Sequence, residues 1–228
     1  MNIPKDFYRR TQFPNSVGAV DGKNVRINML TGSGSLYYNY KRFFSILLLA
    51  LVDANYFFIP VDVGAVVKSG NFNVFYNSNI GRRLESNQLG IPGSRPLPNY
   101  ENGKCMPFVI MGDESFALSE HALRPYPNRN LKAQQRIYNY RLTRARRMIE
   151  CAFCILANKQ KIFHRPLDGT PQFCDSLVKV CCILYKFIRR NDGFQLEDNL
   201  YDSNFENIQA ILTRENTKGK HVGDYFSN

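Results

Sequence analysis

Two aspartates in the sequence are placed to bind a ligand. Asp21 and Asp113 each follow a short apolar run and each is flanked by glycine, within Val-Asp-Gly and Gly-Asp-Glu. Glycine leaves room for a ligand close to the backbone. Two other acids in apolar stretches have simpler explanations. Asp53 precedes Ala-Asn and is interpreted as a turn residue, and Asp62 lies in an alternating stretch, where a solvent-facing side chain is expected.

A third carboxylate, Glu150, stands alone among cations. It is the only acid between Lys132 and Arg165, a stretch that holds nine Lys or Arg residues. One explanation is an ordinary surface ion pair with Arg146 or Arg147, four and three residues earlier on a helix. The other is that Glu150 binds a metal ion close to a polyanion. The helix alone leaves both open.

The three carboxylates together would form a divalent-metal site. If the strands that end at Asp21 and Asp113 are neighbours, a helix carrying Glu150 can pack over the same edge. Carboxylates this close repel one another and have raised pKa values, and a cation removes that penalty. Mg²⁺ prefers oxygen ligands, and two such ions can activate a nucleophile and stabilise the leaving oxygen of a phosphodiester. We therefore expect Mg²⁺ or Mn²⁺ as the cofactor.

The strands that position these residues are visible in the hydrophobic pattern. Val17–Asp21 reads as a first strand that continues after a bulge at Gly22. Phe43–Asp53 is almost wholly apolar, which is typical of a central strand buried on both faces. Tyr56–Val63 returns as a third strand and completes an antiparallel meander. Phe108–Met111 is a further short buried strand.

Helices are predicted from apolar residues at three- and four-residue steps. They are Phe72–Leu84, Tyr138–Leu156 and Phe173–Arg190, the last with Leu177, Val180, Cys181, Leu184 and Ile188 on its core side. Gly90–Pro107 is rich in proline and glycine and is expected to be an irregular connection.

Charge and cysteine content narrow the class of protein. The net charge is +11, and the residues from Asn191 on hold seven acids and three bases, so the basic excess lies before them. This basic excess indicates an anionic partner, and nucleic acid is the first candidate. The start of the chain has no signal peptide, and the longest apolar run is too short to span a bilayer. Cys151 and Cys154 form a CxxC, but the sequence offers no second pair of ligands. We therefore interpret both cysteines as buried apolar side chains and not as zinc ligands.

Four blocks of sequence, in order, resemble the nuclease domain of the PIF/Harbinger transposases and the Harbinger transposase-derived nucleases. The blocks are FPNSVGAVDGKNVRI at Phe13–Ile27, the stretch Gly34–Ala65, PFVIMGDESFALSEHALRPYP at Pro107–Pro127, and QRIYNYRLTRARRMIECAFCILANKQKIF at Gln135–Phe163. The resemblance runs from about Phe7 to Arg190. It implies an α/β, RNase H-like fold with a mixed sheet, made of an antiparallel three-strand meander plus parallel strands and flanked by helices.

The resemblance also implies a function. Asp21, Asp113 and Glu150 would be the catalytic and metal-binding triad of a DDE endonuclease that cleaves DNA in the nucleus, and a Myb-like DNA-binding protein is the family's kind of partner. Three parts are expected: a short lead at 1–16, the nuclease domain at 17–190 and an acidic, flexible tail at 191–228.

The chain departs from the family pattern at several positions. Asn24 and Tyr185 stand where histidine is common, and no acid is found at Ser69–Phe72, where one is expected. Little sequence precedes Phe7, where the family has a helical DNA-binding region. These departures motivate a second hypothesis, a relative that binds DNA or a protein partner without cleaving it.

Further DNA contacts are expected from basic side chains. Arg147, and less directly Arg144, should share Glu150's side of the helix and could bind phosphates. Lys41 and Arg42 follow an aromatic cluster of Tyr37, Tyr38 and Tyr40. This cluster could stack on nucleic acid, but a half-buried edge strand is the favoured interpretation.

Overall fold

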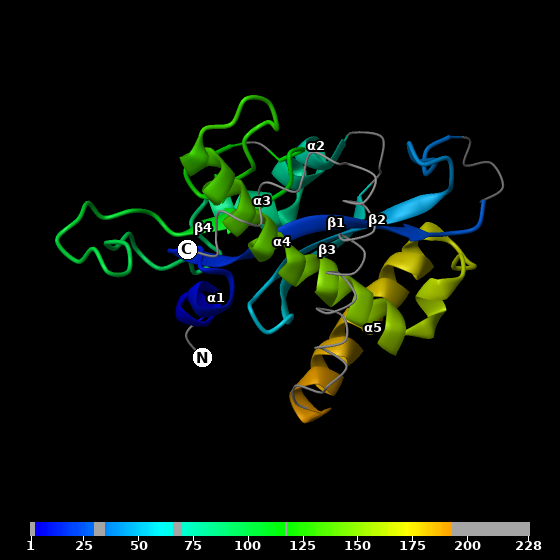
Figure 1. Cartoon of the computed structure of the whole chain (residues 1–228). Helices are drawn as coiled ribbons and strands as arrows, with labels where there is room; N and C mark the ends of the chain where they lie inside the picture. Colours follow the sequence, from blue (N-terminus) through cyan, green and yellow to red (C-terminus); the bar gives the residue numbers. More distant parts are fainter. Residues whose placement is uncertain (1–2, 30–34, 66–69, 117, 193–228) are drawn as a thin grey trace, which may run out of the picture. The chain divides into compact units, whose positions relative to one another are not determined.

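The computed structural model describes residues 3–29, 35–65, 70–116 and 118–192 of the chain (Figure 1). Met1–Ile188 forms one compact unit, and Arg189–Asn228 forms a second. Apart from the last turn of one helix, the fold described below lies in the first unit.

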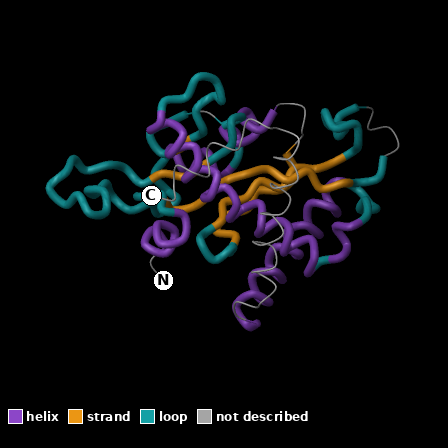
Figure 2. Tube along the Cα trace, viewed as in Figure 1, coloured by secondary structure: helices purple, strands orange, loops and turns teal. Residues whose placement is uncertain are grey.

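A mixed five-stranded sheet organises the first unit (Figure 2). Its strands follow the order β3-β2-β1-β4-β5. Their bounds are β1 Ser16–Arg26, β2 Ser45–Val52, β3 Phe58–Ala65, β4 Val109–Met111 and β5 Ala122–Leu123. Strand β1 is therefore the central strand, with antiparallel β2 on one side and parallel β4 on the other.

The predicted antiparallel meander of β1, β2 and β3 is confirmed. The pairing of β1 with β2 runs without interruption from Ala19 opposite Val52 to Arg26 opposite Ser45. Strand β1 is thus longer than expected and passes Gly22 without a bulge in this pairing. All eight residues of β2 are buried, as its continuous apolar run predicts.

The parallel half of the sheet is short. Strand β4 lies where it was predicted, whereas the two-residue β5, which pairs with Ile110 and Met111, is too short to leave an alternating pattern in the sequence. The connection 86–108 before β4 is irregular, as expected. Its one described bridge joins Arg95 to Met106.

The helices are α1 Ile3–Thr11, α2 Gly70–Asn77, α3 Asn79–Glu85, α4 Ala133–Lys159 and α5 Pro171–Asp192, with a short 3₁₀ turn at Lys161–His164. Helix α4 contains the whole of the predicted Tyr138–Leu156 helix. The single helix predicted at Phe72–Leu84 is wrong in one respect, because Ser78 adopts an extended conformation and separates α2 from α3.

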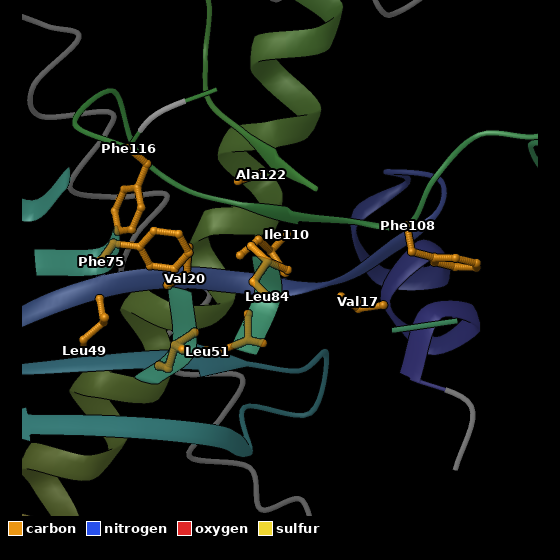
Figure 3. Packing of buried hydrophobic residues seen from close by; sticks show 11 residues of the cluster. Val17, Val20, Leu49, Leu51, Phe75, Leu84, Phe108, Ile110, Phe116 and Ala122 are labelled. Atoms are coloured by element: carbon orange, nitrogen blue, oxygen red, sulfur yellow. The ribbon is translucent and has the colours of Figure 1, made fainter. Parts of the chain in front are cut away.

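Helices cover both faces of the sheet. On one face, Val20, Leu49 and Leu51 of the sheet belong to a buried cluster with Phe75 of α2 and Leu84 of α3 (Figure 3). On the other face, α4 packs against β1, β2 and β4 (Figure 1). Because side chains alternate along a strand, neighbours of Val20 on β1 are directed toward α4.

The two terminal helices differ from expectation. Ile3–Thr11 falls in the segment expected to be a lead, yet it forms α1, which packs on β1 and α4 and buries Phe7 completely. In α5 the predicted core face is partly wrong, because Val180 and Leu184 are 50% and 44% exposed. Cys181 is buried as predicted, and the face that it shares with Cys174, Val178, Cys182 and Tyr185 is the buried one.

The predicted fold class is confirmed: the chain has an α/β fold in which an antiparallel meander continues into parallel strands between layers of helices, consistent with the RNase H-like fold. Among the described residues, none of the helices combines the length and the apolar character needed to cross a bilayer.

Candidate active site: three carboxylates between the sheet and helix α4

Asp21 lies in the middle of the central strand, on the face that α4 covers. Its strand position is fixed by pairing with Ala50 of β2, and the preceding Val20 is directed into the opposite core. The backbone N–H of Gly22 donates a hydrogen bond to Asp21 Oδ1 at 2.7 Å. The fold thus places a carboxylate among apolar strands and ties one of its oxygens to the backbone.

Asp113 follows β4 and begins a tight turn beside Asp21. Parallel pairing brings Met111 opposite Ala19, so the end of β4 lies alongside the part of β1 that leads to Asp21. Both the N–H and the hydroxyl of Ser115 donate to Asp113 Oδ1. The turn also requires Gly112, since a Cβ there would lie 2.6 Å from Cγ of the buried Phe116 ring.

Glu150 comes from α4, and a cation accompanies it. Arg146 Nη2 lies 3.5 Å from Glu150 Oε1, one helical turn away. The ion pair that the spacing allowed is therefore formed, with Arg146 as the partner. Arg146 Nε is buried and has no hydrogen-bond partner, so part of this guanidinium is held away from water without full compensation.

The three carboxylates influence one another electrostatically. Burial raises the pKa of Asp21 from 3.8 to about 6, and the negative charges of Asp113 and Glu150 add to the rise. The Gly22 N–H and the Arg146 guanidinium oppose it. Burial also raises the pKa of Glu150. The positive charges of Arg146 and Arg147 lower this pKa, and the negative charge of Asp113 raises it further. The structure thus brings the three predicted residues into one region.

The chemistry of this donor set fits a hard divalent cation, because it offers carboxylate oxygens that are costly to keep charged without a counter-ion. The geometry is looser than a metal centre. Within the described parts of the chain, no three acidic, histidine or cysteine side chains stand close enough to hold one ion as they are. Glu150 is engaged with Arg146 instead.

Comparison with known proteins decides the family. The model of the DDE superfamily endonuclease family matches residues 20–186, a stretch that begins just before Asp21 and includes Asp113 and Glu150. The chain belongs to the DDE superfamily of endonucleases.

One relative supports the same assignment. The chain is 24% identical over 232 residues to "Protein ALP1-like" from Arabidopsis thaliana, across 93% of this chain and 53% of that protein. The chain therefore spans about half the length of this relative. None of the solved structures matches the chain.

Two further side chains of this DDE domain, Lys23 and Cys154, share the element faces that carry Asp21 and Glu150. Lys23, two residues after Asp21 on β1, places Nζ 5.7 Å from the centroid of the Phe153 ring on α4. Cys154 lies one turn after Glu150, and burial raises the pKa of its thiol. The charge of Lys23 lowers this pKa and that of Glu150 raises it. Both follow from the periods of their elements, because i+2 on a strand and i+4 on a helix share a face.

The four basic residues predicted to contact DNA lie on two different elements, helix α4 and the connection before β2. Arg144 donates a hydrogen bond to the carbonyl of Arg10 at 3.0 Å and so joins α4 to α1. Arg147 is half-buried and its charge acts on Glu150. Lys41 and Arg42 are exposed in the connection before β2.

The departures from the family pattern have local explanations where the structure describes them. Tyr185 is fully buried and donates its hydroxyl to the carbonyl of Tyr56 at 2.8 Å, which secures α5 to the turn before β3. Asn24 accepts a long hydrogen bond of 3.5 Å from the Ser45 hydroxyl. Ser69 lies outside the described residues, so the structure gives no account of the missing acid there.

Proposed function

We propose that this chain is a divalent-metal-dependent DNA endonuclease of transposase descent, acting on nuclear DNA. The observation that carries the proposal is the electrostatic coupling of Asp21, Asp113 and Glu150, which arrive from β1, β4 and α4 within the stretch that matches the family. A bound Mg²⁺ or Mn²⁺ would be held by these carboxylates and would supply an activated water or DNA 3′-hydroxyl and a stabilised leaving oxygen.

The chain's own cations have two tasks in this proposal. Arg146 balances the negative charge of Glu150 and Asp21 while no metal is bound, which keeps three neighbouring carboxylates compatible with a folded protein. Arg147 lies one residue further on the same helix, and in this proposal its charge attracts the DNA backbone toward the site. Both act through charge and neither reads a base.

A second function has one observation in its favour. Arg146 is a basic side chain among the carboxylates, paired with Glu150 at 3.5 Å. A permanent ion pair there would leave a domain that binds DNA or a protein partner without cleaving it. The two functions differ in a single measurable property, metal-dependent cleavage.

Nicking of supercoiled plasmid in Mg²⁺ or Mn²⁺ tests the proposal. The wild type should nick, and Asp113→Asn should not. Glu114→Gln is the matched control, since it removes one negative charge from the adjacent, exposed position and should nick like the wild type. A wild-type protein that is folded, binds DNA and never nicks would support the binding function instead.

A further inference from the structure

The connection between β1 and β2 ends in a well-formed hairpin rather than the half-buried edge strand favoured from the sequence. The Ser45 N–H donates to the Tyr37 carbonyl at 2.9 Å, and the Asn39 N–H donates to the Phe43 carbonyl at 3.0 Å. The Arg42 N–H closes the turn on the Asn39 carbonyl at 3.1 Å. We call residues 37–45 the β2 hairpin; its tip is Tyr40, Lys41 and Arg42.

The β2 hairpin is built from buried polar contacts at its neck. Asn39 is only 4% exposed. Its Oδ1 accepts from the N–H groups of Lys41 and Phe43 at 2.9 and 3.3 Å, and its Nδ2 donates to the Ser45 hydroxyl at 2.8 Å. A single buried amide therefore ties together both sides of the turn.

Aromatic contacts brace the hairpin internally and join it to the end of β1. The rings of Tyr38 and Phe44 meet edge to face with centroids 5.2 Å apart. The Arg26 guanidinium, from the end of β1, lies 4.5 Å from the centroid of Phe43. The hairpin thus continues the rigid β1–β2 pair instead of being a free loop.

The tip exposes a ring between cations. Tyr40 is 79% exposed, Lys41 and Arg42 are exposed beside it, and Lys41 Nζ lies 5.6 Å from the Tyr40 ring centroid. The sequence holds no acid between Asp21 and Asp53, so no carboxylate of this stretch opposes these charges. An exposed ring with flanking cations is the arrangement that stacks on an unpaired nucleobase and binds its phosphates.

Arg42 occupies a backbone conformation that favours glycine or asparagine. Its φ is +64°, in the left-handed region, and three-residue hairpin loops place glycine or asparagine there. An arginine at this position adds a cation to the tip at the expense of backbone strain.

The tip lies within reach of DNA held at the carboxylates. Asp21 pairs with Ala50, and Lys41 precedes Ala50 along a chain that rises about 3.3 Å per residue when extended, which gives an upper limit of about 30 Å. One turn of B-DNA is about 34 Å long. The tip is therefore no further from the carboxylates than about one helical turn of DNA.

We propose that the β2 hairpin binds DNA with unpaired bases, with Tyr40 stacked on a base and Lys41 and Arg42 on the adjacent phosphates. This rests on the proposed function for the origin of such DNA, namely strands opened or cut at the carboxylates. The binding itself needs no metal.

The test compares two fluorescent DNAs, a blunt duplex and the same duplex with a single-stranded extension, by anisotropy in EDTA. The wild type should bind the extended DNA more tightly. Tyr40→Ala should weaken that binding about tenfold and leave the blunt duplex unchanged, because stacking on one base is lost. Tyr40→Phe retains the ring and should bind like the wild type. Two outcomes would overturn the proposal. In one, Tyr40→Ala binds the extended DNA as tightly as the wild type does. In the other, Tyr40→Ala loses the same factor of affinity for the blunt and the extended DNA.

Arg42→Gly separates this role from a structural one. Glycine relieves the backbone at φ +64°, so the melting temperature should stay equal or rise while affinity for the extended DNA falls. Arg42→Gly that binds the extended DNA like the wild type would remove Arg42 from the interface. Because EDTA excludes metal, a hairpin that binds as described in a protein that never nicks plasmid would overturn only the proposed function.

Discussion

Glu150 forms an ion pair with Arg146 and is proposed as a metal ligand, and a substitution can separate these two roles. As an ion-pair partner of Arg146 it would contribute about 0–1 kcal/mol, as partly exposed pairs do. As a metal ligand it would be indispensable for cleavage. We expect Glu150→Gln to abolish nicking while leaving the metal-free protein as stable as the wild type or more stable, because repulsion among the carboxylates is relieved. Melting curves and plasmid nicking on one preparation measure both.

The neighbouring cation gives the control for that experiment. Arg147→Ala should retain a metal response but weaken DNA binding, and it should flatten the salt dependence of binding by about one unit of slope. An active Glu150→Gln protein would return Glu150 to the role of a surface ion-pair partner.

Asp21 predicts a pH dependence of stability with a defined sign. Its pKa is about 6 in the folded protein and 3.8 as the ordinary value, so the folded state binds more protons between these limits. The contribution of Asp21 to the free energy of unfolding therefore rises as pH falls from 6 toward 4, and is lost as pH rises through 6.

Urea denaturation at pH 7 and pH 5, on wild type and Asp21→Asn, measures this contribution. Asparagine does not titrate, so the stability advantage of Asp21→Asn at pH 7 should shrink at pH 5. If the two proteins differ in free energy of unfolding by the same amount at both pH values, burial does not raise the pKa of Asp21 to about 6.

At the element scale, the sequence predicted the elements whose residues repeat regularly and missed those set by one contact. The apolar run of β2 and the stripe of α4 are long enough to define both type and position. By contrast, α1 is nine residues in a polar segment and depends on the burial of Phe7 against the sheet. In α5 an apolar residue occurs on nearly every side, so tertiary packing, through Tyr185 and its neighbours, decides which side is buried.

The break between α2 and α3 shows how one polar side chain overrides a helical pattern. The Ser78 hydroxyl accepts from the Gly81 N–H at 3.0 Å and donates to the Phe75 carbonyl at 2.6 Å, which caps α3 and ends α2. We expect Ser78→Ala to lower the free energy of unfolding by about 1 kcal/mol, measured by urea denaturation.

Ser86→Ala is the matched control for this substitution. Ser86 is exposed and its hydroxyl donates to the Arg82 carbonyl at the other end of α3, so its loss should change stability by less than about 0.5 kcal/mol. Equal effects of the two substitutions would show that capping by Ser78 does not define the boundary.

Across the first unit, the charges of Asp21, Asp113 and Glu150 act on one another, although Asp21 lies within β1 and not at the strand end expected from the sequence. Periodicity predicts which side of helix α4 is buried, whereas the grouping of the three acids was implied by the family resemblance. The sequence could not predict Arg146 as the partner of Glu150, since both Arg146 and Arg147 lie within one turn. Nor could it predict the exposed tip of the β2 hairpin, which depends on the buried Asn39 amide.

The charge distribution predicts how the molecule binds DNA. With a net charge of +11 and contacts mainly to phosphates, binding to duplex DNA should be largely independent of sequence. Its affinity should fall steeply and linearly on a log–log plot against salt. Titrations of two unrelated duplexes over a range of salt concentrations measure this. Tight, selective binding to one of them at physiological salt would contradict it.

Melting the protein in increasing Mn²⁺ measures whether Asp21, Asp113 and Glu150 form one metal site. Binding to the native state alone stabilises it by mass action, by about 2.7 kcal/mol at a hundredfold excess over Kd. The melting temperature of the wild type should rise with Mn²⁺, and that of Asp21→Asn should rise much less. Equal rises in the two proteins would contradict a metal site at these carboxylates.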